Sequence, residues 1–249
     1  MWTTVGNTPL PYESIRNEQL VVDVLPLFGG RAVRIVHNAS GECITSYNVP
    51  DALFFPFAGG EETRVGTALQ APAGSSLAQF AVVEKSDRSL TLEAKPLGFH
   101  LRRILTLAPQ APVLTVTNVF TNPTDKPASL LARSHLELEL GDLMKTRVSF
   151  TDRTGNAVER TMEPIVAGLR QGEFYRDRKT PGGSWTFTGS KGLTVTQTFD
   201  PDQVDFTWLY AYPAELNELE VEVSAKSVTL APGEQITFSH TIELSQVAE

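Results

Sequence analysis

Residues 98–140 read GFHLRRILTLAPQAPVLTVTNVFTNPTDKPASLLARSHLELEL, and this segment decides the fold class. Three stretches within it carry β-branched and aliphatic residues at alternate positions, which is typical of strands with one buried face. Pro, Asn and Asp residues between the stretches supply the chemistry of tight turns. The segment therefore predicts three consecutive antiparallel strands.

The last of the three strands has an apolar and a polar face. In residues 129–140 the even positions are mostly Leu, whereas the odd positions include Arg133, His135 and Glu137. Because alternate residues of a strand point to opposite faces, these three side chains should lie together. We expect His135 to carry any chemistry, although a solvated outer face would show the same alternation.

The first of the three strands has one charge on its apolar face. Phe99, Leu101 and Leu105 alternate on that face, and Arg103 lies among them. We include Arg103 among the arginines that are expected near His135.

The same period-two pattern continues along most of the chain. We predict further strands at residues 19–26, 31–37, 42–47, 77–84, 89–95, 145–150, 157–162, 184–188, 193–199, 204–212, 218–223 and 235–244. No window shows the apolar spacing and caps of a confident helix. We predict an all-β fold, a large antiparallel β-sandwich, as one domain over residues 1–249 with an irregular lead-in at residues 1–17.

Two connections attract attention. Gly29 and Gly30 permit a tight turn with positive φ between two predicted strands. Residues 48–76 show no periodicity and are expected to form a long connection, which in compact domains is often functional. The run Phe54-Phe55-Pro56-Phe57 within it either lines a ligand site or closes the end of the core.

Composition excludes several classes of function. A net charge of −8 and a pI near 5.1 argue against a nucleic-acid partner, which needs a clustered basic face. No apolar run approaches the ~18 residues of a membrane helix, so no membrane partner is expected. The first residues lack the pattern of a signal peptide, which favours a cytoplasmic location, with a trimmed leader as the alternative. The oligomeric state is not readable.

No motif for a metal or a cofactor is present, so we expect neither. The four histidines are scattered at positions 37, 100, 135 and 240, and no element carries two of them at metal-ligand spacing. His240 alternates with Ile236, Phe238 and Ile242 and is expected to be a core histidine. The glycine-rich motifs of hydrolases, dinucleotide-binding proteins and nucleotide triphosphatases do not occur.

A second source of carboxylates lies near the C-terminus. In residues 218–223, Glu218, Glu220 and Glu222 alternate with apolar residues, which places the three carboxylates on one face of a strand. A solvated outer face would again produce this pattern.

Three segments together resemble the galactose mutarotase-like, or aldose 1-epimerase-like, supersandwich family, and their order spans nearly the whole chain. They are Val24-Leu25-Pro26 with Phe28-Gly29-Gly30-Arg31; Arg103-Ile104-Leu105-Thr106-Leu107 with Thr117-Asn118-Val119-Phe120-Thr121-Asn122 and Lys126-Pro127; and Leu219-Glu220-Val221 with Leu230-Ala231-Pro232-Gly233-Glu234.

The resemblance implies roles for two residues. In the enzymes of that family a His after the Thr-Asn and Lys-Pro segment protonates the sugar ring oxygen, and a Glu near the C-terminus removes the anomeric proton. His135 matches the acid, and Glu220 matches the base with Glu222 behind it. The family's second, substrate-binding His would fall within residues 54–65, where this chain has none.

Three functions stay open. The first is a carbohydrate-recognising protein that binds a sugar or polysaccharide in a groove on one sheet; the second is a mutarotase that uses His135 and Glu220; the third is a structural or assembly domain without a ligand. We expect the groove to be lined by Arg64, Arg103, Arg133, Glu137 and Trp185, with Trp208 as the alternative aromatic.

Overall fold

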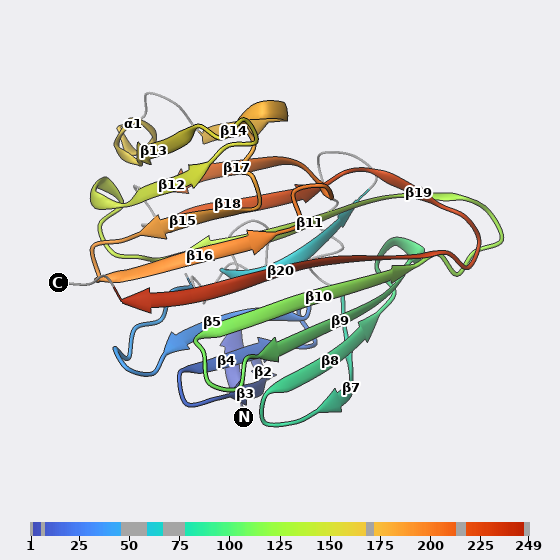
Figure 1. Cartoon of the computed structure of the whole chain (residues 1–249). Helices are drawn as coiled ribbons and strands as arrows, with labels where there is room; N and C mark the ends of the chain where they lie inside the picture. The colour runs from blue at the N-terminus through green and yellow to red at the C-terminus, as the bar shows by residue number, and fades with distance from the viewer. Residues whose placement is uncertain are drawn as a thin grey trace.

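A computed structural model describes residues 2–5, 8–45, 59–66, 78–167, 172–212 and 218–246, which form two large antiparallel sheets packed face to face (Figure 1). The first sheet runs β13 (Ala157–Thr161), β12 (Arg147–Thr151), β15 (Ser184–Thr188), β16 (Leu193–Phe199), β20 (Gln235–Gln246), β10 (Val113–Thr121), β9 (His100–Leu107), β8 (Ser89–Ala94) and β7 (Ala81–Lys85).

The second sheet lies behind the first in Figure 1 and carries the polar cluster described below. It runs β14 (Gly172–Arg176), β17 (Val204–Tyr212), β18 (Glu218–Ala225), β11 (Ala128–Leu138), β6 (Gly60–Gly66), β5 (Arg31–His37), β4 (Leu20–Leu25) and β3 (Glu13–Arg16), and β19 (Val228–Leu230) also pairs with β11. Outside the two sheets are a ribbon of β1 (Trp2–Val5) and β2 (Thr8–Pro11), the short helix α1 (Glu163–Val166) and 3-10 turns at Pro96–Gly98, Leu143–Lys145 and Asp177–Lys179.

The three strands predicted in residues 98–140 are present as β9, β10 and β11. β9 and β10 pair with each other in the first sheet, whereas β11 crosses to the second sheet. The connection between β10 and β11 projects with β19 at one end of the molecule (Figure 1). This crossover ties the two sheets together through consecutive strands.

The core lies between the two sheets and is built from the apolar face of each. Leu105 on β9, Val116 on β10 and Leu136 on β11 are fully buried there. Transfer of such side chains out of water supplies ~1.5–3 kcal/mol each, which holds the sheets together. The apolar face predicted for β9 is confirmed, and Arg103 lies on it.

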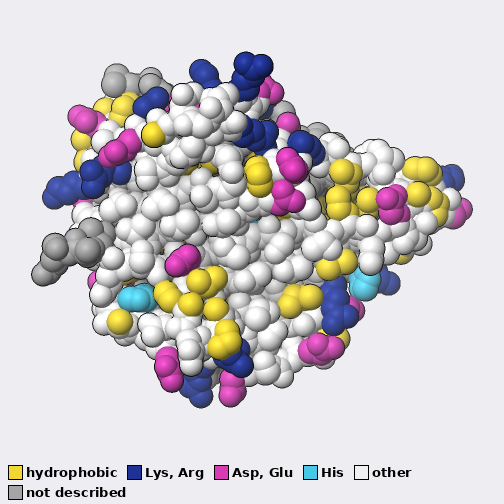
Figure 2. All heavy atoms as spheres, in the orientation of Figure 1, with side chains coloured by type: hydrophobic (Ala, Val, Ile, Leu, Met, Phe, Trp, Pro, Cys, Tyr) yellow, Lys and Arg dark blue, Asp and Glu magenta, His cyan; other side chains and the backbone are white. Residues whose placement is uncertain are grey.

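The outer face of the first sheet is polar but mostly uncharged. Solvent-facing positions of its central strands carry Thr side chains, of which Thr198 on β16 is exposed and Thr115 on β10 and Thr241 on β20 are half-buried. Figure 2 shows this face, on which white atoms predominate with some yellow hydrophobic groups, and most charged side chains of both signs lie toward the rim. Among the described residues no helix is long and apolar enough to cross a membrane.

The sequence prediction was wrong in the N-terminal and long-loop regions. Residues 1–17 are not an irregular lead-in, because they contain β1, β2 and β3. Residues 48–76 are not a continuous loop, because they contain β6. Both faces of β6 carry polar side chains, so the sequence lacks the apolar alternation that would predict a strand.

Three further elements were missed and one predicted strand is absent. The short strands β14 and β19 and the four-residue helix α1 were not predicted, since each is too short for a periodic signal. Within the expected strand at 42–47, the structure has only isolated bridges at Cys43 and Thr45, and residues 46–47 lie outside the described part.

Glycine is required where β6 begins. Gly60 has a φ of +84°, and a Cβ atom there would lie 2.4 Å from the carbonyl oxygen of Ala32 on β5. Only glycine accepts both this backbone conformation and this close approach. Glycine at position 60 therefore allows the start of β6 to pack directly against the backbone of β5.

A buried ion pair joins the sheets through the core. Arg103 on β9 and Glu61 on β6 are both fully buried and in direct contact. Arg103 also donates to the carbonyl oxygen of Gly30 at 3.0 Å and to the side chain of Asn118 at 3.2 Å. Guanidinium groups buried in this way need several acceptors, because an unpaired buried charge is costly.

We predict that Arg103→Met destabilises the protein by ~3–5 kcal/mol, because it leaves the Glu61 carboxylate buried without its guanidinium partner. Urea denaturation followed by tryptophan fluorescence measures this loss. Arg102→Met is the matched control on the same strand, since Arg102 is 40% exposed and pairs with Glu84 at 3.4 Å. We expect the control to cost under ~1 kcal/mol. Equal losses in the two variants would contradict the prediction.

Candidate functional site

A row of side chains crosses the second sheet on the face that points away from the core. Cross-strand partners in this row are Phe174 on β14, Trp208 on β17, Glu222 on β18, His135 on β11 and Glu62 on β6. Directly opposed residues of neighbouring antiparallel strands point to the same side of a sheet. The row therefore runs from aromatic residues at the edge strand to ionisable residues at the centre.

His135 lies at the centre of a group of carboxylates. Its Nε2 atom is 2.7 Å from Glu220, 3.7 Å from Glu137 and 3.9 Å from Glu222, and its Nδ1 atom is 3.5 Å from Glu62. Each of these side chains is at most 3% exposed. We call the buried ionisable residues around His135 the polar cluster; its members are Arg31, Glu62, Arg64, Arg133, His135, Glu137, Glu218, Glu220 and Glu222.

Two arginines stand side by side within the polar cluster. Arg64 and Arg133 are direct cross-strand partners on β6 and β11, an arrangement in which like charges repel. The carboxylate of Glu222 offsets this repulsion, because one oxygen accepts from Arg64 at 3.0 Å and the other from Arg133 at 2.6 Å. Glu222 thus fixes both guanidinium groups.

Arg31 holds the other side of the polar cluster. Its guanidinium is 2.7 Å from Glu62 and 3.6 Å from Glu137, and it also donates to the carbonyl oxygen of Gly59. The carboxyl group of Glu137 is completely buried, and among the described residues neither of its oxygens has a hydrogen-bond partner. Glu137 is consequently the least well satisfied carboxyl group of the cluster.

These contacts divide the carboxyl groups by their pKa values. Burial opposes ionisation of Glu62, but Arg31 and Arg64 outweigh it and lower the pKa of Glu62 to about 2. Burial likewise opposes ionisation of Glu220, and His135 outweighs it and lowers the pKa of Glu220 to about 2. Burial dominates at Glu137, where it raises the pKa well above its usual range.

The pKa of Glu222 is also raised, chiefly by burial and in spite of His135 and Arg133. The polar cluster contains five carboxyl groups and three guanidinium groups, so it holds more acids than bases. A proton retained on Glu137 reduces this excess. The cluster can therefore donate hydrogen bonds from its charged guanidinium groups and from protonated Glu137, and accept them at its ionised carboxylates.

The polar cluster contains one set of side chains that could reach a metal ion. Ligand atoms of His135, Glu220 and Glu222 lie within 4.8 Å of one another. However, the Arg64 guanidinium is 2.7 Å from His135 Nε2 and 3.0 Å from Glu222, so positive charge is already supplied at this place. The donor set fits the arginine rather than a divalent cation.

Most of the site residues that the sequence predicted are brought together. His135, Glu220, Arg133, Glu137 and Arg64 all belong to the polar cluster. The sequence analysis missed Arg31, which begins a predicted strand, and Glu62, which lies on the unpredicted strand β6.

Two predicted site residues lie elsewhere. Arg103 is in the core between the sheets with Glu61, and Trp185 is fully buried on β15, where its Nε1 donates to Gln197 at 2.8 Å. The structure brings neither of them to His135. Trp208, the alternative aromatic, lies in the cross-strand row. The run at residues 54–57 lies outside the described residues.

Two of the other three histidines have structural surroundings. His240 is buried in the core, 3.3 Å from the Ser134 hydroxyl and 3.5 Å from Glu61, as expected for a core histidine. His37 Nδ1 is 3.0 Å from the hydroxyl of Ser40 in a turn.

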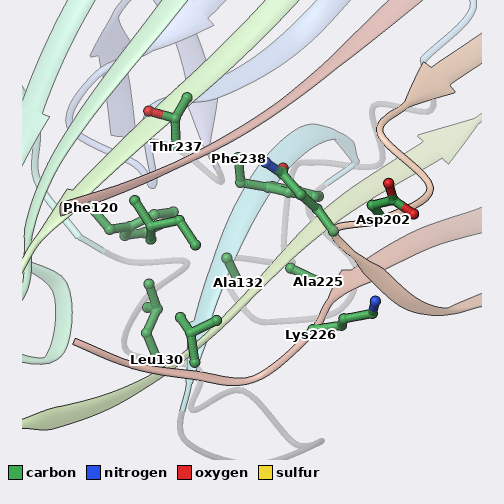
Figure 3. A pocket seen from close by; sticks show the side chains of 11 residues that line it. Phe120, Leu130, Ala132, Asp202, Ala225, Lys226, Thr237 and Phe238 are labelled. Atoms are coloured by element: carbon green, nitrogen blue, oxygen red, sulfur yellow. The ribbon is translucent and has the colours of Figure 1, made fainter.

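A separate cavity of about 160 Å³ opens between the sheets and is largely apolar (Figure 3). It is lined on the core side of β11 by Leu130 and Ala132, and by Phe120 and Phe238 of the first sheet. Such a lining suits a hydrocarbon better than a sugar, whose hydroxyl groups need polar partners. A ligand rich in hydroxyl groups is therefore matched better by the polar cluster than by this cavity.

Comparison with solved structures identifies the fold as a galactose mutarotase-like β-sandwich. A galactose mutarotase-like protein from Lactobacillus casei superposes with a TM-score of 0.73 at 12% identity, over 94% of this chain and 100% of the other. A galactose mutarotase related enzyme from Lactobacillus acidophilus superposes with a TM-score of 0.72 at 13% identity, over 96% and 99%.

The same fold also occurs within larger proteins. This chain covers 49% of a TPR-domain containing protein from Parabacteroides distasonis, with a TM-score of 0.70 at 15% identity over 98% of this chain. No family model and no curated protein matches the sequence. At identities this low, the superpositions establish the shared fold alone, and the activity has to be argued from the site.

We predict that the free energy of unfolding of Glu137→Gln, measured relative to that of the parent protein, increases as the pH rises from about 4 to about 8. With its pKa raised, folded Glu137 keeps its proton where the unfolded chain, with a pKa of ~4.3, has lost it. Rising pH therefore costs the parent folding stability until the folded group ionises, whereas Gln has no proton to lose. Urea denaturation at several pH values measures the difference, and a constant difference would contradict the prediction.

Proposed function

We propose that the polar cluster binds a carbohydrate. The observation that carries the proposal is the cross-strand register that places arginine, glutamate and histidine groups on one sheet face around His135. Sugar hydroxyl groups both donate and accept hydrogen bonds, and charged partners make such bonds stronger. The sugar-related names of two structural neighbours agree with this proposal.

A bound sugar would replace contacts that the cluster now makes internally. Arg64 lies against both His135 and Glu222, and Arg133 lies against the other oxygen of Glu222. Sugar hydroxyl groups inserted here would accept from the guanidinium groups and donate to the carboxylates. The exchange keeps every buried charge paired, which a less polar ligand could not do.

The second candidate is a mutarotase, favoured by the 2.7 Å contact between His135 Nε2 and Glu220. The two residues that the family resemblance implies are thus neighbours. Ring opening needs an acid and a base at different atoms of the sugar, so the contact must break for a sugar to lie between them. A carboxylate with a pKa of about 2 is also a weak base. For both reasons we rank binding before catalysis.

Binding is tested by isothermal titration calorimetry with glucose, galactose and their oligosaccharides. We predict that Arg133→Met weakens the affinity about tenfold or more, ~1.4 kcal/mol, because it removes a charged hydrogen-bond donor. Arg102→Met on the outer face of the other sheet is the control and should bind like the parent protein. Absence of binding by the parent to every sugar would contradict the proposal and favour a structural domain.

The mutarotase reading is tested by polarimetry on freshly dissolved α-glucose and α-galactose. It predicts acceleration by the parent protein and loss of that acceleration in both His135→Ala and Glu220→Gln. Binding without acceleration would leave the protein as a carbohydrate binder for those sugars.

A further inference from the structure

An exposed aromatic side chain ends the cross-strand row. Phe174 on β14 is 51% exposed, whereas Trp208 next to it is half-buried and Glu222 beyond is fully buried. Among the described strands, β14 is the edge strand of the second sheet. The row that contains His135 therefore meets solvent at Phe174.

The Phe174 ring packs against neighbouring side chains. Its ring stacks on the indole of Trp208 with an interplanar angle of 6° and a centroid distance of 5.0 Å. The guanidinium of Arg176 lies 5.3 Å from the centre of the Phe174 ring and 4.9 Å from that of Phe206. An exposed ring that is packed on an indole, with a guanidinium over it, is a surface at which a ligand can bind with less ordering cost than at an isolated side chain.

Gly172 makes room for this arrangement. A Cβ atom at position 172 would lie 2.7 Å from Nε1 of Trp208 and 2.6 Å from the carbonyl oxygen of Leu209. Any larger residue would thus displace the indole on which Phe174 rests. The stacked pair depends on glycine at the start of β14.

Arg176 adds polar groups to the same surface. Its side chain is exposed, and no ion pair involving it is found among the described residues. The guanidinium offers N–H donors in a planar fork next to an aromatic face. Apolar ring faces together with adjacent donors suit the C–H face and the hydroxyl edge of a pyranose.

From this geometry we infer that Phe174, Trp208 and Arg176 form a second sugar subsite, and that the ligand is an oligosaccharide rather than a free monosaccharide. The inference rests on the proposed function of the polar cluster. Three strand spacings of ~4.8 Å separate the backbones of Phe174 and His135, about 14 Å in all. One pyranose cannot span this separation, whereas a short chain can reach from the cluster to the edge.

The test compares monosaccharides with tetrasaccharides by isothermal titration calorimetry, using glucose, galactose, maltotetraose, cellotetraose and β-1,4-galactotetraose. We expect at least one tetrasaccharide to bind at least about fivefold more tightly than its monosaccharide, a gain within the range of aromatic stacking. Phe174→Ala should remove that gain and leave monosaccharide affinity unchanged. Phe174→Trp, which keeps an aromatic face, should retain it.

Val83→Ala is the matched control, because Val83 is 46% exposed on the edge strand β7 of the other sheet. It should bind every sugar like the parent protein. Equal affinities for monosaccharide and tetrasaccharide, or a gain that survives Phe174→Ala, would overturn the inference while leaving the proposed function intact.

Two other results are informative. If no sugar binds, the proposed function and the inference both fail. If Phe174→Ala weakens self-association in sedimentation experiments without changing any tetrasaccharide affinity, the aromatic edge is an interface between copies of the chain, and the inference is overturned.

Discussion

The structure depends on the balancing of charges along β11, a strand that is covered on both faces. Its core face meets the first sheet, and its other face carries Arg133, His135 and Glu137 in a fully enclosed setting. Charges in such a place must be paired locally, because removal from water costs several kcal/mol per ion. The neighbouring strands β6 and β18 are consequently rich in glutamate, and Glu222 serves two arginines at once.

Much of this could be anticipated from alternation. The division of β9 and β11 into two faces follows from period two, and so does the grouping of His135 with Arg133 and Glu137. Alternation does not say which sheet a strand joins or which way a given face is turned. For this reason Trp185 and Trp208 were equally plausible, and only the fold separates the core residue from the one in the row.

The strand that completes the site was the hardest to foresee. β6 reads GEETRVG, which has the composition of a solvated turn. Its glutamates can be buried because each is paired with an arginine, Glu61 with Arg103 and Glu62 with Arg31. Both arginines come from strands that are distant in the sequence. Such long-range pairing produces no local sequence pattern. Alternation therefore predicted which leucines are buried and did not predict that the charged residues of β6 are buried.

The two consecutive glutamates of β6 also act as a check on strand register. Glu61 faces the core ion pair and Glu62 faces the polar cluster, so a slip by one residue would exchange them and turn Thr63 and Arg64 to the opposite faces. Both polar networks would then be broken together, which makes misregistered pairing costly. Insertions or deletions inside this strand should therefore be tolerated far less readily than changes in hydrophobic residue size.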